Sequence, residues 1–84
     1  MNLNAKKRQH ILETLYQDRQ ANASRLHQEQ WTPIAELKNA VDDIDFALSV
    51  LVELRYVERS GHKLRITGQG VLACEAGQDV VSLG

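Results

Sequence analysis

The sequence predicts a mainly α-helical domain with a small β-hairpin, built as a three-helix core, the hairpin and a short C-terminal helix. Apolar residues recur at helical spacing up to about residue 55. A strand-like stretch with Ser60-Gly61-His62 at its centre follows, and this is the composition of a tight turn. A length of 84 residues accommodates one domain. We expect it to span residues 1–84, with 78–84 either packed locally or forming a loose tail.

The first helix is expected to start near Ala5, because Asn4 before it is a good N-terminal cap. It should end between Arg19 and His27, although Leu26 lies on the same helical side and is compatible with a longer helix. Its core-facing residues are expected to be Ile11, Leu12 and Leu15.

The segment WTPIAEL predicts a second helix. Thr32 is a favourable N-cap, and Pro33 would occupy the first helical position, where its missing N–H is not needed. Ile34 and Leu37 should then face inward. Trp31 is expected to anchor the core beside a short strand, and stacking on a ligand is the alternative role for this ring.

A third helix is predicted from about Asp43 to Arg55. Asp42 and Asp43 have side chains suited to N-terminal capping, and Asp45 in the first turn suits the positive end of the helix dipole. The apolar stripe of this helix consists of Ile44, Ala47, Leu48, Leu51 and Leu54.

The stretch Tyr56–Ile66 is expected to form a two-stranded hairpin that turns at Gly61. Thr67 can cap the last helix, and Gly77 is expected to end it. Val71 and Leu72 on that helix can pack either on the domain itself or on a second copy, so a homodimer is one expectation.

From Trp31 to Cys74, about half of the chain, the sequence resembles winged-helix regulators of the MarR-like and PadR-like kind, and two segments carry the resemblance. LSVLVELRYVER resembles their recognition helix, and LRITGQG resembles the segment after their wing. The resemblance implies a winged helix-turn-helix fold, in which the third helix enters the DNA major groove and the hairpin, or wing, contacts the backbone or minor groove. One departure is that Arg55-Tyr56 replaces the glycine that usually follows the third helix, so an ordinary residue must make that turn.

The composition narrows the functional classes. A net charge of −1 excludes a uniformly basic DNA-coating protein, but it allows a local basic patch. Cys74 is the single cysteine, which predicts a small buried side chain in a reducing compartment. The sequence has no apolar stretch long enough to span a membrane and no signal-peptide pattern, so we expect a cytoplasmic protein without a membrane partner.

No catalytic or metal-binding pattern is recognisable in the sequence. His10, His27 and His62 are far apart and lack partners at metal-ligand spacing. The segment TGQG lacks the Lys-Ser/Thr pair of a phosphate-binding loop. We therefore expect a protein that is not an enzyme and that uses no metal and no cofactor.

The leading functional prediction is a DNA-binding transcriptional regulator that contacts DNA through a basic wing and the start of the first helix. Arg and Lys side chains beside a projecting turn can hold phosphates or enter a minor groove. The same side chains can instead serve only to keep an edge hairpin soluble. The candidate DNA-contacting residues are Lys6, Lys7, Arg8, Arg59, His62, Lys63 and Arg65.

The third helix supports a different function, that of a protein–protein interaction module. Carboxylates on a helix that enters DNA meet repulsive phosphates. An exposed aromatic residue among acids is more typical of a protein-binding surface. The candidate docking face consists of Asp42, Asp45, Phe46, Ser49 and Glu53.

Overall fold

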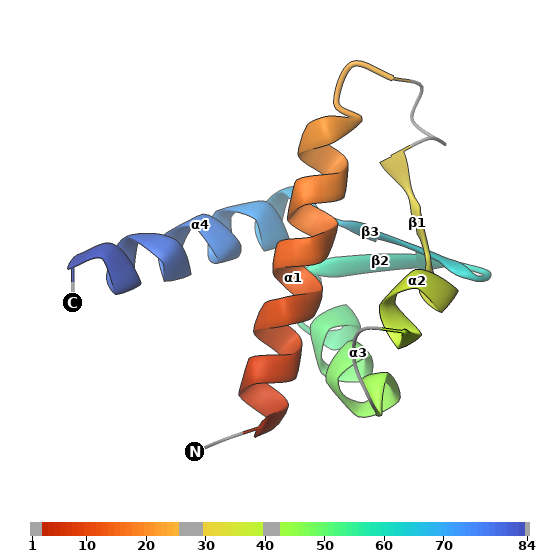
Figure 1. The fold of residues 1–84 in the computed structure, drawn as a ribbon, viewed down its shortest axis with the longest axis horizontal. Coiled ribbons are helices and arrows are strands. Elements are labelled where there is room, and N and C mark those ends of the chain that lie inside the picture. The colour runs from red at the N-terminus through yellow and green to blue at the C-terminus, as the bar shows by residue number, and fades with distance from the viewer. Residues whose placement is uncertain (1–2, 26–29, 40–42, 84) are drawn as a thin grey trace.

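A computed structural model describes residues 3–25, 30–39 and 43–83, with side chains described as far as Ala76 (Figure 1). This part of the chain is mainly helical and contains a small three-stranded antiparallel sheet. Its elements are, in order, α1 (Leu3–Ala21), β1 (Thr32–Pro33), α2 (Ile34–Lys38), α3 (Ile44–Glu53), β2 (Val57–Ser60), β3 (Lys63–Ile66) and α4 (Gly68–Leu83).

The sheet consists of the predicted hairpin and the short strand β1, in the order β1-β3-β2. Ser60 pairs with Lys63, so the hairpin turns through Gly61 and His62 alone. Gly61 has a φ of 60° and His62 is not in the positive-φ region, which is the pattern of a type II′ turn. The turn also contacts α2, because the Ile34 N–H donates to the His62 carbonyl at 2.8 Å.

The core lies where α1, α2 and α3 cover one face of the sheet. The apolar stripes predicted for the helices are buried there, with the exception of Leu54, which is 46% exposed at the end of α3. Cys74 of α4 is also buried, as the sequence predicts. The residues that form the core are Ile11, Leu12, Leu15, Ile34, Leu37, Ile44, Ala47, Leu48, Leu51, Val57, Leu64, Ile66 and Cys74.

The third helix ends two residues earlier than predicted, at Glu53, and Arg55 makes the turn that follows it. Arg55 has a φ of 68°, the left-handed conformation that glycine usually provides at this position. The Arg55 N–H donates to the Val52 carbonyl at 3.0 Å, and the Tyr56 N–H donates to the Leu51 carbonyl at 3.0 Å. These two bonds form a Schellman motif, so the chain closes this helix normally without a glycine.

The start of α4 follows the prediction closely. The Thr67 hydroxyl accepts a hydrogen bond from the Gly70 N–H at 3.0 Å and donates to the Arg55 carbonyl at 2.6 Å, so it caps α4 and ties it to the end of α3. Gly70 packs so tightly that a Cβ there would lie 2.1 Å from the Tyr56 carbonyl oxygen. The second glycine of TGQG is therefore required by packing.

Two predicted caps are wrong, and a third is right only in its position. The helix α1 begins at Leu3, so Asn4 lies inside it. Pro33, not Thr32, occupies the N-cap position of α2, because Thr32 belongs to β1 and pairs with Leu64. Asp43 does occupy the N-cap position of α3, but it has a φ of 53° and makes no side-chain capping bond; Asp42 lies outside the described residues.

The Thr32 hydroxyl has a different partner from the predicted one. It is 2% exposed and donates to Asp18 Oδ2 of α1 at 2.6 Å. Thr32 pairs with the buried Leu64 of β3, and directly paired residues point to the same face of a sheet. The Thr32 side chain therefore points to the face that α1 covers. This bond fastens β1 to α1, a tertiary role that local capping rules do not anticipate.

Two further expectations are corrected. Trp31 is not part of the core: it is half-buried and lines a surface cleft, because it lies on the face of the sheet opposite to α1. The helix α4 continues through Gly77 to Leu83. A glycine inside a helix costs only about 1 kcal/mol relative to alanine, and no proline follows to stop the helix.

Among the described helices, none is long and apolar enough to cross a membrane.

Candidate functional site

A groove runs between α3 and the outer edge of β2, and two adjoining clefts form it. The cleft nearer the hairpin turn, of about 450 Å³, is lined by Asp45, Leu48, Ser49, Val52, Glu53 and Arg59. The cleft nearer the base of the hairpin, of about 440 Å³, is lined by Trp31, Val52, Arg55, Val57, Glu58, Arg59 and Thr67. Because Val52 and Arg59 line both clefts, we treat them as one surface, the α3–β2 groove.

One wall of this groove is the solvent-exposed side of α3. Asp45, Ser49 and Glu53 follow each other at intervals of four residues, so their side chains form one row along the helix. Phe46 lies beside this row and is 60% exposed. The Ser49 hydroxyl donates to the Phe46 carbonyl at 2.7 Å, so its proton is used within the helix. We call these four residues the outer face of α3.

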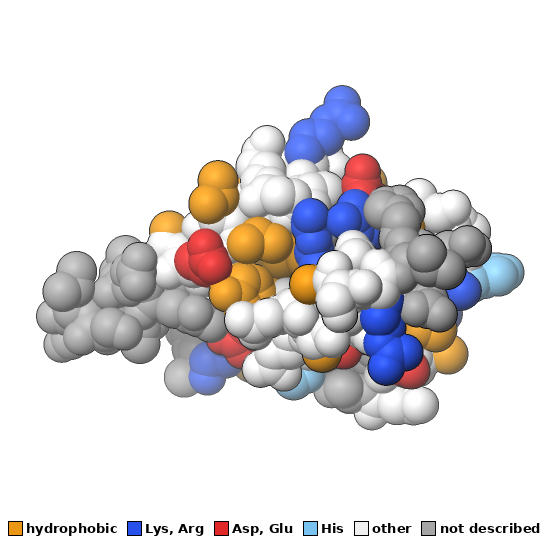
Figure 2. Space-filling view, turned by 90° about the horizontal axis from the view of Figure 1, so that it is seen from above, with side chains coloured by type: hydrophobic (Ala, Val, Ile, Leu, Met, Phe, Trp, Pro, Cys, Tyr) orange, Lys and Arg blue, Asp and Glu red, His pale blue; other side chains and the backbone are white. Residues whose placement is uncertain are grey.

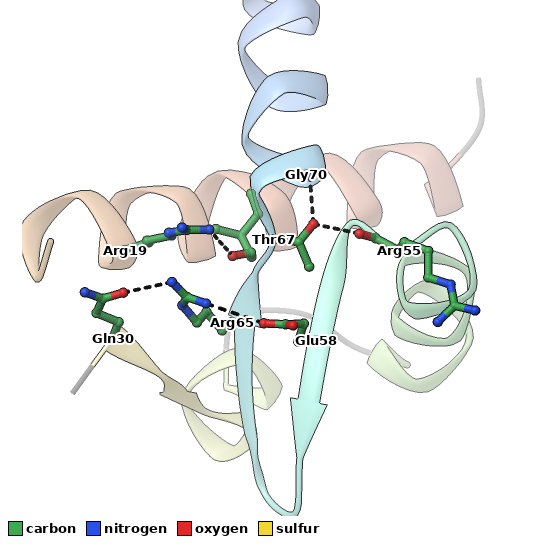
Figure 3. Close-up of polar contacts among 8 residues, drawn as sticks. Arg19, Gln30, Arg55, Glu58, Arg65, Thr67 and Gly70 are labelled. Carbon is green, nitrogen blue, oxygen red and sulfur yellow. Dashed lines mark hydrogen bonds and ion pairs between the residues drawn. The ribbon is translucent and has the colours of Figure 1, made fainter. Parts of the chain in front are cut away.

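The other wall carries positive charge. Arg59 is exposed, and its Nε–H donates to the Gly61 carbonyl at 3.3 Å. Arg55 is exposed at the junction between α3 and β2, and its guanidinium has no ion pair within the described part of the chain (Figure 3). The groove therefore has Asp45 at one end, Arg55 at the other and Arg59 beside both clefts.

Arg65 is held in a polar network on the face of the sheet opposite to α1 (Figure 3). Its side chain is only 14% exposed. Its Nη2 donates to the Gln30 Oε1 at 3.0 Å, and its Nη1 forms an ion pair with the Glu58 Oε2 at 3.5 Å. Its Nε is buried and has no hydrogen-bond partner among the residues that the structure describes. Arg19 of α1 is committed as well, because it donates to the Ile66 carbonyl at 2.8 Å.

A second, smaller cleft lies where α4 crosses α1. It is about 200 Å³ in volume and is lined by Tyr16, Arg19, Gln20, Ala23 and Val71. Figure 2 shows hydrophobic side chains gathered beside the base of α4 on this side of the molecule.

Two titratable groups lie near this cleft. The Tyr16 hydroxyl donates to Glu75 Oε2 at 2.8 Å, and this hydrogen bond raises the pKa of Tyr16. Burial raises the pKa of the nearby Cys74 thiol, which disfavours a reactive thiolate.

The structure does not gather the seven candidate DNA-contacting residues into one patch. Lys6, Lys7 and Arg8 lie at the start of α1, at the bottom of Figure 1, whereas the hairpin turn lies at the right. Arg59, His62 and Lys63 are exposed around that turn. Arg65 is tied to Glu58 and Gln30, so three of the seven residues remain together as an exposed group.

The candidate docking residues, by contrast, do come together. Asp45, Phe46, Ser49 and Glu53 are all exposed on one side of α3, whereas Asp42 lies outside the described residues. Sequence reasoning missed the rest of the groove, namely Trp31, Val52 and Arg55. One local feature of the sequence pointed to this part of the groove, namely Arg55 at a position where the resemblance leads one to expect glycine. A residue held at an unfavourable φ can be kept because its side chain has a role.

The described residues contain no cluster of His, Cys, Asp and Glu that could hold a metal ion. A scan against protein-family models, a search of curated proteins and a search of solved structures each returned no match to this chain.

Proposed function

We propose that this protein is a winged-helix module that binds another protein through the outer face of α3 and the adjoining α3–β2 groove. The element order, with three helices followed by a hairpin, agrees with the winged helix-turn-helix arrangement that the sequence resembles. The observation that carries the proposal is Phe46, a large aromatic side chain 60% exposed beside Asp45 and Glu53. Aromatic residues are enriched at the centres of protein interfaces, where they often contribute a large share of the binding energy.

The charges of this surface suggest the chemistry of the partner. Asp45 lies next to Phe46 and Glu53 lies two helical turns further along the same side of α3, and no described basic side chain forms an ion pair with either acid. A partner that places an apolar side chain against Phe46 and Lys or Arg side chains at the rim would satisfy both features. Ser49, whose proton is already used, would contribute only as an acceptor.

The charge balance is less favourable for a helix that enters DNA. From Asp43 to Thr67 the chain has four carboxylates and four Lys or Arg residues, so α3 and the hairpin together are neutral. Two of the carboxylates, Asp45 and Glu53, lie on the helix that would meet the phosphates, and Asp43 directly precedes it, so these charges would be repelled there. Arg65, the central cation of the hairpin, is already paired with Glu58.

The test is a set of three variants, each of which changes one surface at a time. Phe46→Ala and Asp45→Asn alter the outer face of α3, and Lys63→Ala alters the hairpin turn. Partners are captured on the wild-type chain, and each is then titrated against the purified variants by calorimetry. We expect loss of Phe46 to weaken binding at least tenfold, as for a hot-spot aromatic residue, and Lys63→Ala to leave it unchanged. A partner that is indifferent to Phe46 and Asp45 contradicts the proposal.

DNA binding through the hairpin is the second candidate function, as in a winged-helix transcriptional regulator. Arg59, His62 and Lys63 are exposed around a projecting two-residue turn, which suits contact with phosphates or a minor groove. If DNA binds there, Lys63→Ala should weaken binding to all duplexes and reduce the salt dependence by about one counterion. Asp45→Asn should then tighten binding, which is the opposite of its effect on a protein partner. Fluorescence anisotropy with random duplex DNA at two salt concentrations measures both effects.

We also propose a homodimer that forms through α4. This helix projects from the body of the molecule, and Leu72 on it is 69% exposed (Figure 1). The apolar cleft beside Val71 offers a second copy a place for such a side chain.

A further inference from the structure

We infer that the partner contributes an extended segment, which pairs as an added strand with the open edge of β2. This inference rests on the proposed protein-binding function and specifies how the α3–β2 groove would be used. In such strand addition, main-chain hydrogen bonds to a sheet edge provide affinity, and side-chain contacts beside the edge provide specificity.

The position of β2 in the sheet supplies the first argument. The strand order places β2 at an edge, and no further strand pairs with it among the described residues. The two-residue turn makes Ser60 and Lys63 the hydrogen-bonded closing pair of the hairpin. Because such pairs alternate along an antiparallel ladder, the N–H and C=O groups of Val57 and Arg59 point away from β3.

The second argument is that these free main-chain groups face the groove. Val57 and Arg59 both line the cleft nearer the base of the hairpin, and Arg59 also lines the cleft nearer the turn. No main-chain hydrogen bond to either residue is present on that side within the described part of the chain. A strand placed there would therefore meet two residues that each offer one donor and one acceptor.

The floor and ends of the groove define the segment that fits. Leu48, Val52 and Val57 form an apolar floor, which suits an aliphatic side chain in the middle of the segment. Asp45 lies at the end near the hairpin turn and Arg55 at the end near its base. The complementary segment is extended, with a basic side chain toward Asp45 and an acidic side chain toward Arg55.

The experiment starts from a phage-displayed library of random linear peptides selected against the full-length protein. Trp31 is the single tryptophan of the chain and lines the groove, so its fluorescence reports on groove occupancy by a synthetic selected peptide. We expect N-methylation of the peptide backbone to weaken binding at every second residue and to have little effect at the residues between. Loss of one main-chain hydrogen bond should weaken binding by about three- to tenfold.

Arg59→Pro and Arg59→Ala form a matched pair on the protein side. Both remove the charge, but only proline removes the main-chain N–H that points into the groove, and an edge strand tolerates proline at such a position. We expect Arg59→Pro to bind the selected peptide about three- to tenfold more weakly than Arg59→Ala does. Circular dichroism and thermal unfolding verify that both variants are folded, and Ser60→Ala, on β2 but not among the residues that line the groove, is the control for general effects on the hairpin.

Charge reversal tests the direction of the segment. Selection against Asp45→Lys should favour an acidic residue where the wild type favours a basic one, and Arg55→Glu should reverse the preference at the other end.

The outcomes separate strand addition from the proposed function. If N-methylation shows no alternation and the two Arg59 variants bind equally, strand addition is wrong. In that case, peptide binding that still depends on Phe46 and Asp45 leaves the proposed docking function intact. A selection that yields no peptide dependent on Asp45, Phe46 or Arg59 rejects both.

Discussion

Arg55 occupies a backbone conformation that is costly for any residue with a side chain. Its φ of 68° places Cβ close to the neighbouring carbonyl oxygen, at a cost of about 1–2 kcal/mol. The Schellman motif and the Thr67 hydroxyl, which donates to the Arg55 carbonyl, hold it there. A glycine would satisfy the same turn without this cost, so the arginine side chain must be explained by something other than the fold. The proposed function provides such an explanation, because Arg55 lies at one end of the α3–β2 groove.

Replacing Arg55 with glycine should therefore stabilise the protein and weaken binding in the groove. We expect Arg55→Gly to raise the free energy of unfolding by about 0.5–1 kcal/mol, measured by urea denaturation. Arg55→Ala is the matched control, because it removes the guanidinium and keeps the strained φ. A stability gain of equal size in both variants would show that the charge, and not the backbone conformation, is responsible.

Gly70 shows the opposite situation, in which the fold alone requires the residue. A Cβ at this position would lie 2.1 Å from the Tyr56 carbonyl oxygen and 2.7 Å from Ile66 Cγ1, so the backbone must move to admit it. We expect Gly70→Ala to lower the free energy of unfolding by about 1–3 kcal/mol, the range for overpacking. Gly68→Ala, where nothing lies within 4 Å of the added Cβ, should be neutral or stabilising. Similar losses in both variants would contradict this packing account.

At the scale of elements, the apolar stripe of α3 contributes four residues to the core, more than any other described element. Leu48 is 3% exposed and lies in the middle of that stripe. Leu48→Ala should lower the free energy of unfolding by about 2–5 kcal/mol, because it removes buried methyl groups and leaves a cavity. Leu3→Ala, at a side chain that is 66% exposed, should change it by less than about 0.5 kcal/mol. Thermal or chemical denaturation of both variants gives the comparison.

The junction of α1 and α4 depends on pH through Tyr16. Its hydroxyl donates to Glu75, and this bond raises the pKa of Tyr16 above its usual value of 10.0. Because the folded pKa is raised, the bond stabilises the fold fully below about pH 10 and is lost as the pH rises through the folded pKa. Tyr16→Phe should therefore be less stable than wild type at pH 7, with a difference that shrinks in strong alkali. A difference that stays constant across that range would exclude ionisation of Tyr16 as its source.

The elements that could be predicted from the sequence are those set by local patterns. Helical spacing located the buried faces of α1, α2 and α3, and Ser60-Gly61-His62 located the turn, because neighbouring residues decide these features. The cap predicted at Thr32 was wrong because tertiary structure overrides local preference. Thr32 is drawn into a strand by its pairing with Leu64, and its hydroxyl bonds to Asp18 instead of to the helix that follows.

At the scale of the whole molecule, the candidate site could be predicted only in part. The exposed side of α3 follows from helix periodicity, and Asp45, Phe46, Ser49 and Glu53 do share it. The opposite wall of the groove depends on how the hairpin packs beside α3, and no pattern within either segment encodes that arrangement. For the same reason, the basic residues of the sequence suggested one surface, whereas the fold separates Lys6 from Lys63 and pairs Arg65 internally (Figures 1 and 3).

The shape of the molecule leads to the last prediction, which concerns the homodimer. The 16-residue helix α4 is about 24 Å long. Its described side chains that pack against the core, Val71 and Cys74, lie in its first two turns, and its ribbon projects from the body beyond them (Figure 1). A helix that extends into solvent gains little stability from its own hydrogen bonds, so contact with a second copy would stabilise it.

If Leu72 packs into the apolar cleft of a twofold mate, sedimentation equilibrium should show a dimer. Leu72→Asp should convert it to a folded monomer, because an unpaired carboxylate in an apolar contact is costly. Leu3→Asp, at a comparably exposed leucine on α1, should leave the dimer intact. A wild-type chain that remains monomeric at high concentration would remove α4 as a dimer interface and leave the α3–β2 groove as the binding surface to be tested.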